Sequence, residues 1–314
     1  MPERKFKVAI IIPYFGKFPE WIGLFFYTCY RNQFISPNIT IDWFIFTDNY
    51  NTTCKYPNVN ISYMDFEDYC EVVSNSLNIK FSPLKPYKLC DLKPFYGVIH
   101  KSVLVNYTHW GFGDLDLCYG NLSLIINERN LSRYSLITSH ADRIAGHFTI
   151  IKYESEYTKM CFSILDWEQK LLSDKILGLD ELELSILVRK SFVNLWRIYR
   201  YFFKPFNFGM YNFMKIPNWL HNLHSNSLIK EFYTSPLPKD GEHWIFDVDN
   251  NKIIDPYGKE IPYLHFIFFK KTPFLRTSNY WKSGFYRLGN NTFIENEGGQ
   301  IIFDNKAVKY ETRK

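Results

Sequence analysis

The sequence predicts an α/β fold in which helices flank a mainly parallel sheet. Two apolar runs, Val8–Pro13 and Ile41–Thr47, are continuous rather than alternating, which is typical of strands buried on both faces. Residues Pro19–Arg31 between them read as a helix, and Val59–Met64 reads as a short third strand. Strand, helix and strand at this spacing indicate a βαβ unit, and therefore an α/β sheet.

The middle of the chain continues this alternation. Pro94 suits the first turn of a further helix, because its fixed backbone angle is already helical and its missing N–H is not needed there. Residues 134–139 and 147–152 read as strands. Asp180 suits the N-cap of a long helix whose apolar face continues to Tyr199.

From residue 236 the sequence returns to strands. Residues Trp244–Ile254 are predicted to form a hairpin, because two asparagines in the middle favour a turn. Tyr263–Phe269 reads as another strand, and residues 285–303 as a last hairpin. The predicted architecture is a sheet core followed by a helical aromatic insertion and C-terminal β-hairpins.

The composition indicates a packed protein of enzyme size. Of the 314 residues, 46% are hydrophobic, which is too many for a disordered chain. Lys plus Arg number 37 and Asp plus Glu 32, and the net charge of +5 is too dilute for a nucleic-acid surface, so we expect no nucleic-acid partner. The six cysteines form no CxxC pair, and no stretch approaches the roughly 20 apolar residues of a membrane span. We therefore expect reduced thiols and a cytoplasmic protein, either soluble or peripheral on the inner face of the cytoplasmic membrane.

Asp114 and Asp116 form the central candidate site. Side chains two apart in an extended chain point the same way, so this pair presents two carboxylates to one hard divalent cation. Such a triplet also arises by chance, and Asp247 and Asp249 repeat it in the predicted hairpin turn. The first pair instead follows a buried aromatic strand that contains two glycines. We therefore predict metal binding at Asp114 and Asp116 and not at the second pair.

Five collinear blocks of the sequence resemble a known family. They read PYKLCDLKPFYG, WGFGDLDLCYG, AGHFT, LDE and YLHF, and lie at residues 86–97, 110–120, 145–149, 179–181 and 263–266. Together with the opening AIIIPYF and the later FTD, they resemble bacterial glycosyltransferase-like proteins of capsule and O-antigen loci, which have the GT-A fold. The match covers about residues 6–275 and is similar to retaining galactosyltransferase and glycogenin-like enzymes.

The resemblance implies a GT-A-like, Rossmann-type sheet flanked by helices and a division of the chain into three segments. Residues 1–190 would form the nucleotide-sugar-binding core that carries the D-x-D pair. Residues 191–235 would form a basic aromatic helical insertion. Residues 236–314 would return to the core with a metal and phosphate strand and a C-terminal hairpin.

The resemblance also implies a metal centre that His265 completes. In related retaining enzymes this histidine opens an H-x-x-G-x-x-K-P-W pattern. Here Phe268 replaces the glycine and Thr272 the proline, so the phosphate-binding lysine is either Lys270 or Lys271. Two carboxylates and an imidazole suit Mn²⁺ or Mg²⁺, and the imidazole favours Mn²⁺. The alternative for His265 is an imidazole packed in an aromatic strand.

Residues after two predicted parallel strands are expected to bind the nucleotide. Open α/β sheets bind ligands at the carboxyl ends of their strands, so an aromatic ring there is expected to stack on the base. Tyr14 is alternatively a loop anchor. These expected cofactor-binding residues are Pro13, Tyr14, Phe15 and Asp48.

A second nucleotide-binding group is expected just before the Pro94 helix. Lys88, Asp91 and Lys93 lie where a lysine reaches a phosphate and an acid binds a ribose or sugar hydroxyl. The alternative is a solvated loop in which Asp91 is the helix N-cap.

The resemblance places two further groups near the donor sugar and the acceptor. Asp180 and Glu181 would lie near the anomeric carbon as catalytic acids. A helix cap also explains Asp180, so Glu181 is the better candidate for contact with the acceptor hydroxyl or the donor sugar. The substrate-binding residues implied around a turn are His140, Asp142, Gly146 and His147.

The sequence therefore predicts a metal-dependent glycosyltransferase. It would move a hexose from a nucleotide-sugar, expected to be a UDP-sugar, to a glycan or polyprenyl-diphosphate-linked acceptor of a surface polysaccharide. A nucleotidyltransferase on a similar sheet is one alternative, although such enzymes need a glycine-rich phosphate loop and this chain has one glycine there, Gly16. A non-catalytic glycan-binding or assembly protein is the other alternative.

The segment 191–223 predicts contact with an anionic membrane surface. It combines many aromatic and aliphatic side chains with Arg197, Arg200 and Lys204. This mixture is typical of an interfacial helix that buries rings among lipid headgroups and attracts anionic lipid. The alternative is an aromatic helix packed on the sheet or buried in a homodimer.

Overall fold

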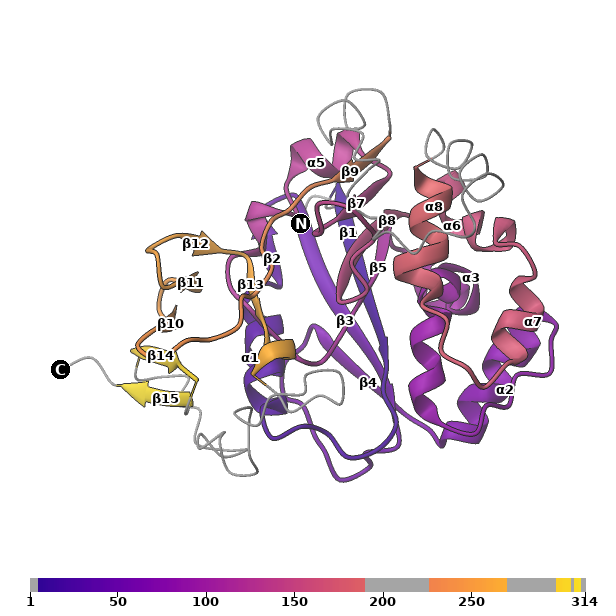
Figure 1. The fold of residues 1–314 in the computed structure, drawn as a ribbon, viewed down its shortest axis with the longest axis horizontal. Coiled ribbons are helices and arrows are strands. Elements are labelled where there is room, and N and C mark those ends of the chain that lie inside the picture. The colour runs from indigo at the N-terminus through magenta and orange to yellow at the C-terminus, as the bar shows by residue number, and fades with distance from the viewer. Residues whose placement is uncertain (1–4, 190–225, 270–297, 306–307, 312–314) are drawn as a thin grey trace, which may run out of the picture.

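The computed structural model describes residues 5–189, 226–269, 298–305 and 308–311, and these form an α/β structure (Figure 1). The strands are β1 (Phe6–Pro13), β2 (Phe34–Ser36), β3 (Ile39–Thr47), β4 (Val59–Tyr63), β5 (His109–Gly113), β6 (Leu117–Tyr119), β7 (Leu136–Thr138), β8 (Phe148–Lys152), β9 (Ser227–Ile229), β10 (Trp244–Asp247), β11 (Lys252–Ile254), β12 (Glu260–Ile261), β13 (Tyr263–His265), β14 (Gln300–Phe303) and β15 (Val308–Glu311). The α-helices are α1 (Ile22–Arg31), α2 (Phe66–Leu77), α3 (Tyr96–Ile99), α4 (Lys101–Leu104), α5 (Glu128–Arg133), α6 (Glu156–Lys159), α7 (Trp167–Leu172) and α8 (Ser185–Val188). The 3₁₀-helical segments are η1 (Pro86–Phe95), η2 (Leu122–Leu124), η3 (Met160–Ser163) and η6 (Phe266–Phe268), and η4 (Leu179–Leu184) is a π-helical turn.

The main sheet has the strand order β2-β3-β1-β5-β8-β7-β9 among the described residues, and β4 pairs with β3. β1 lies between β3 and β5 and is parallel to both, which confirms the predicted βαβ unit. β8 runs antiparallel to β5, and β7 runs antiparallel to β8. The carboxyl ends of β1, β3, β5 and β7 and the beginning of β8 therefore meet at one edge of the sheet.

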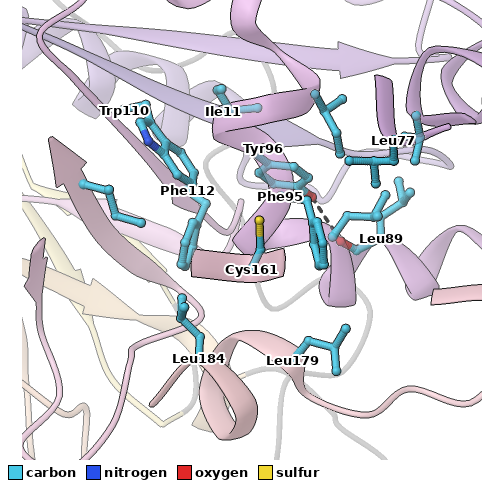
Figure 2. Packing of buried hydrophobic residues seen from close by; sticks show 14 of the residues in the cluster. Ile11, Leu77, Leu89, Phe95, Tyr96, Trp110, Phe112, Cys161, Leu179 and Leu184 are labelled. Carbon is cyan, nitrogen blue, oxygen red and sulfur yellow. Dashed lines mark hydrogen bonds between the residues drawn. The ribbon is translucent and has the colours of Figure 1, made fainter. Parts of the chain in front are cut away.

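Both faces of this sheet are buried, as the continuous apolar runs predict. Ala9 and Ile11 of β1 point into a core covered by α2, α3, α6 and η1, part of which Figure 2 shows. Val8 and Ile10 point to the opposite face, which α1 and α5 cover. Within the first core the Tyr96 hydroxyl donates to the carbonyl of Leu89 at 3.1 Å, so this buried phenol keeps a hydrogen bond.

Two smaller sheets extend the fold on the α1 side (Figure 1). One has the order β12-β11-β10-β14-β15 among the described residues, and it packs on α1 through an apolar cluster that contains Leu24 and Trp244. Its β10–β11 pair is the predicted hairpin. The predicted last hairpin within 285–303 lies mostly outside the described residues, and its described end, β14, pairs with β10 and with β15. The other small sheet pairs β13 with β6.

Two predicted helices differ from the structure. Pro94 lies inside η1, whose helical geometry begins at Pro86, and not in the first turn of a helix. The helix expected from Asp180 ends at Val188, where the backbone of Arg189 leaves the helical region, and residues from 190 lie outside the described part. All six cysteines lie in the described residues and none is paired in a disulfide, while the expectation of reduced thiols stays a prediction. In the ranges described here, no helix has the length and apolar character needed to cross a membrane.

Candidate functional site

Asp114, Asp116 and His265 come together at the carboxyl end of β5. One potential ligand atom from each of the three residues lies within 4.8 Å of the other two. Among the residues described, this is the group of carboxylate, imidazole or thiol side chains that has the spacing of a metal site. Asp114 and Asp116 lie in the connection from β5 to β6, and Leu115 between them points away into the core. Asp116 and Leu115 therefore point in opposite directions, as the sequence predicts.

Pairing of β13 with β6 brings His265 to the two aspartates. His265 lies opposite Leu117, the residue after Asp116. The backbone N–H of Phe266 donates to the carbonyl of Asp116 at 2.8 Å, and His265 Nε2 lies 3.3 Å from Asp116 Oδ2. Two segments that are far apart in the sequence are thus held in register by backbone hydrogen bonds, and the prediction that His265 faces Asp116 is supported.

Lys93 places a positive charge among these acids. Its ammonium group lies 2.7 Å from Asp114 Oδ1 and 3.9 Å from Asp180 Oδ2, and it donates to the carbonyl of Gly146 at 2.9 Å. Burial lowers the pKa of Lys93, but Asp114 and Asp180 outweigh it, and the net result is a pKa above the ordinary value. Lys93 is therefore charged at every physiological pH and joins the candidate metal ligands to the Asp180 segment.

Asp180 is buried, while its neighbour Glu181 faces solvent. Burial raises the pKa of Asp180 to about 6, against the opposing effect of Lys93. The Glu181 side chain is 46% exposed and lies 3.6 Å from Arg143 Nε. Gly146 lies directly against both acids, because a Cβ added there would be 2.6 Å from Asp180 Oδ2. Because Gly146 has no side chain, the side chains of Asp180 and Glu181 can occupy the space beside it.

The loop after β7 carries the other predicted substrate residues. His140 Nδ1 lies 3.6 Å from Glu231 Oε2 and is only partly buried. Asp142 is also partly exposed and interacts electrostatically with Arg189. His147 differs from both, because it is 5% exposed and packs inside the protein. The prediction that His147 lines the substrate site stays a prediction, because Asp180 of the same candidate site is equally buried.

The predicted nucleotide-binding residues after β1 and β3 lie at the same sheet edge. Asp48 Oδ1 accepts the backbone N–H of Gly16 at 2.8 Å, so these two loops are joined. Pro13 and Tyr14 are partly exposed, and the Tyr14 hydroxyl donates to the carbonyl of Lys17. The expectation for Phe15 is corrected, because this ring is 8% exposed and packs with the aromatic side chains of α2.

Lys88 and Asp91 form a buried ion pair in place of the expected ligand contacts. Their side chains are 2% and 0% exposed, and Lys88 Nζ lies 2.8 Å from Asp91 Oδ2. Lys88 also donates to the carbonyls of Lys170 and Lys175, so its three N–H groups have three acceptors. The carboxylate of Asp91 accepts the backbone N–H of Leu179, just before Asp180. The pair thus fastens the Asp180 segment to η1 and has no free group for a phosphate.

The remaining predictions have different outcomes. The carboxylate of Asp247 accepts the backbone N–H groups of Asp249 and Asn250, which confirms a turn at that D-x-D triplet. Lys270 and Lys271 lie outside the described residues, and so does the segment 191–223.

Sequence reasoning missed Trp21, which contacts both segments that carry the candidate ligands. Its indole N–H donates to the carbonyl of Leu115 at 2.8 Å, and its ring packs edge-on against Phe266, with centroids 5.4 Å apart. The sequence shows Trp21 simply as a residue near the start of a predicted helix. Nothing in that local pattern indicates a contact with residues so distant along the chain.

Comparison with known proteins assigns the chain to a family but not to an activity. The model described as "Family of unknown function (DUF6625)" matches residues 10–296, and the chain belongs to this family. No curated protein matches the chain. Among solved structures, the galactosyltransferase LgtC in complex with donor and acceptor sugar analogues is similar at 10% sequence identity and a TM-score of 0.28. That match covers 56% of this chain and 70% of that chain. Values this low assign no activity, so function has to be argued from the residues of the site.

Proposed function

We propose that this protein is a metal-dependent glycosyltransferase that moves a hexose from a nucleotide-sugar to a glycan acceptor. The observation that supports it most directly is the meeting of Asp114, Asp116 and His265 within 4.8 Å at the carboxyl edge of the sheet. Open α/β sheets bind nucleotides and other ligands at this edge. The donor is proposed to be a UDP-sugar, and the acceptor a surface polysaccharide on a polyprenyl-diphosphate carrier.

The side chains of Asp114, Asp116 and His265 fit a divalent cation. Two carboxylate oxygens and one imidazole nitrogen suit Mn²⁺, and Mg²⁺ less closely, and three protein ligands leave positions for phosphate oxygens. Such a cation stabilises the negative charge that develops on a nucleoside diphosphate as the glycosidic bond breaks. Asp114, Asp116 and His265 would hold it.

The residues beside this group have distinct proposed roles. Lys93 balances the charge of Asp114 and Asp180 and keeps both carboxylates in place. Asp180, whose carboxylate lies directly against Gly146, is proposed to bind the donor sugar. Glu181 is exposed and is proposed to contact the acceptor hydroxyl, as are the partly exposed residues of the loop after β7, His140 and Asp142. Pro13, Tyr14 and Asp48 are proposed to bind the nucleoside.

The experiment that tests the proposal is metal-dependent hydrolysis of nucleotide-sugars. The wild-type protein should release nucleoside diphosphate slowly from at least one UDP-hexose when Mn²⁺ is present and not when it is chelated. Asp116→Asn should abolish this release without unfolding, whereas the matched variant Asp249→Asn should leave it unchanged. Tight donor binding with no release would indicate a glycan-binding or assembly protein. Release of pyrophosphate from a nucleoside triphosphate would indicate a nucleotidyltransferase.

The role of His265 is tested separately. His265→Ala should raise the Mn²⁺ concentration needed for half-maximal activity roughly 10-fold or more, because a direct ligand is lost. The melting temperature of the ion-free protein serves as the control. A lowered melting temperature with unchanged Mn²⁺ dependence would make His265 a core histidine.

A further inference from the structure

His147 contacts two of the candidate metal ligands in different ways. Its carbonyl accepts the backbone N–H of Asp114 at 3.2 Å. Its imidazole stacks on the ring of His265, with centroids 4.5 Å apart and planes at 29°. His147 immediately precedes β8 of the main sheet, whereas His265 is in β13 of a small sheet, so this residue links two separate sheets at the candidate site.

A hydrogen bond fixes the orientation of the His147 ring. Its Nε2 lies 2.9 Å from the Tyr263 hydroxyl, and that hydroxyl donates its proton to the carbonyl of Tyr233 at 3.1 Å. The Tyr263 oxygen therefore acts as acceptor toward His147, and the His147 hydrogen is on Nε2. Tyr263 and His265 are two residues apart in β13, so their side chains are on the same face of the strand. The imidazole of His147 therefore contacts both Tyr263 and His265.

We infer that His147 is a positioning residue that sets the ring plane of His265 for metal binding. The terminal torsion of a histidine side chain has a broad minimum, so a neighbouring ring is needed to hold the imidazole in one plane. The His147 ring supplies that plane, and Asp116 lies within 3.3 Å of the nitrogen it orients. Hydrogen-bonding partners behind a metal ligand commonly change metal affinity 10- to 100-fold, and we expect a loss at the lower end of that range from removal of this stacked ring. The inference rests on the metal site of the proposed function.

The chain offers a closely matched control at His100. This histidine is also buried and stacks on Phe46, with centroids 4.4 Å apart and planes at 30°. Its Nε2 lies 2.9 Å from the Tyr69 hydroxyl. Both histidines thus have a stacked ring and a tyrosine hydroxyl at Nε2, but the ring stacked on His100 is not a candidate metal ligand.

The test measures Mn²⁺ affinity of the purified protein without donor, by electron paramagnetic resonance of free Mn²⁺. His147→Leu removes the flat ring and should weaken Mn²⁺ binding about 10-fold or more. His147→Phe restores a ring but not the hydrogen bond to Tyr263, so it should bind Mn²⁺ more tightly than His147→Leu and about as tightly as Tyr263→Phe. His100→Leu should leave the affinity unchanged. Tyr263→Phe removes only the hydroxyl that contacts His147 and should also weaken Mn²⁺ binding, whereas the matched variant Tyr69→Phe should leave the affinity unchanged. These two variants test the inference even if the leucine variants do not fold.

Each outcome decides the inference. Weakened binding in His147→Leu and Tyr263→Phe, with partial recovery in His147→Phe, supports it. Wild-type affinity in Tyr263→Phe and His147→Leu, or equal losses in the leucine and phenylalanine variants of His147, overturns it while leaving the metal site intact. If wild type and Asp116→Asn bind Mn²⁺ equally weakly, the metal site itself fails, and the inference fails with it.

Discussion

The buried pair of Lys88 and Asp91 gives the sharpest test of how this fold is held together. Replacing Lys88 by Met keeps the length of the side chain and removes its charge. The variant loses the 2.8 Å contact with Asp91 and the two hydrogen bonds to backbone carbonyls. It leaves the Asp91 carboxylate, 0% exposed, without its cation.

The expected loss of stability follows from this burial. Removing one partner of a buried ion pair costs about 3–5 kcal/mol, because the remaining charge is desolvated and uncompensated. Asp91 keeps the backbone N–H groups of Leu177 and Leu179, which stabilise the carboxylate. We therefore expect Lys88→Met to lower the free energy of unfolding by about 3 kcal/mol, at the lower end of that range.

The assay is urea denaturation at pH 7, followed by far-ultraviolet circular dichroism. Lys170 and Glu183 provide the control, since their side chains lie 2.6 Å apart but are 24% and 28% exposed. Lys170→Met should lower the free energy of unfolding by about 1 kcal/mol or less, because solvent screens that pair. A comparably small loss in Lys88→Met, together with weaker nucleotide binding, would refute the buried-pair explanation and return Lys88 to a phosphate-binding role.

Three further predictions address other parts of the chain. Burial raises the pKa of Asp180 to about 6 despite a neighbouring lysine, so the folded state binds this proton more tightly than the unfolded chain does. The stability that the proton contributes is therefore lost as the pH rises from about 4 to 6. Urea denaturation should show that Asp180→Asn gains roughly 2–3 kcal/mol of unfolding free energy relative to wild type across that interval. Gly146→Ala should reduce donor hydrolysis about 100-fold, because the new Cβ lies 2.6 Å from a carboxylate oxygen of Asp180 that must move by most of an ångström. Vesicle co-sedimentation should show that the protein binds anionic liposomes at low salt, is released at high salt, and binds more weakly when Arg197, Arg200 and Lys204 are replaced by Gln. If the wild-type protein does not bind, the segment 191–223 belongs to the core or to a dimer interface instead.

The metal ligands and the ion pairs were not equally predictable from the sequence. Asp114 and Asp116 are two residues apart, so local geometry alone indicates that they share a direction. His265 is indicated only by a family resemblance, and the pairing of β13 with β6 places it beside Asp116. Lys88 and Lys93 lie five positions apart in one segment and were assigned the same role. The structure separates them, because Lys88 is surrounded by acceptors of the α7 region while Lys93 reaches Asp114.

The sequence by itself determined the α/β class, the first strands and helix, and the β10–β11 hairpin. These features follow from apolar periodicity, turn residues and residue spacing, which act over a few neighbouring positions. Only the tertiary structure decided that Phe15 and His147 are buried, that Asp91 pairs internally, and that Trp21 contacts both ligand-bearing segments. Burial and pairing depend on which distant segments pack together, and that is set by the fold as a whole rather than by any local pattern.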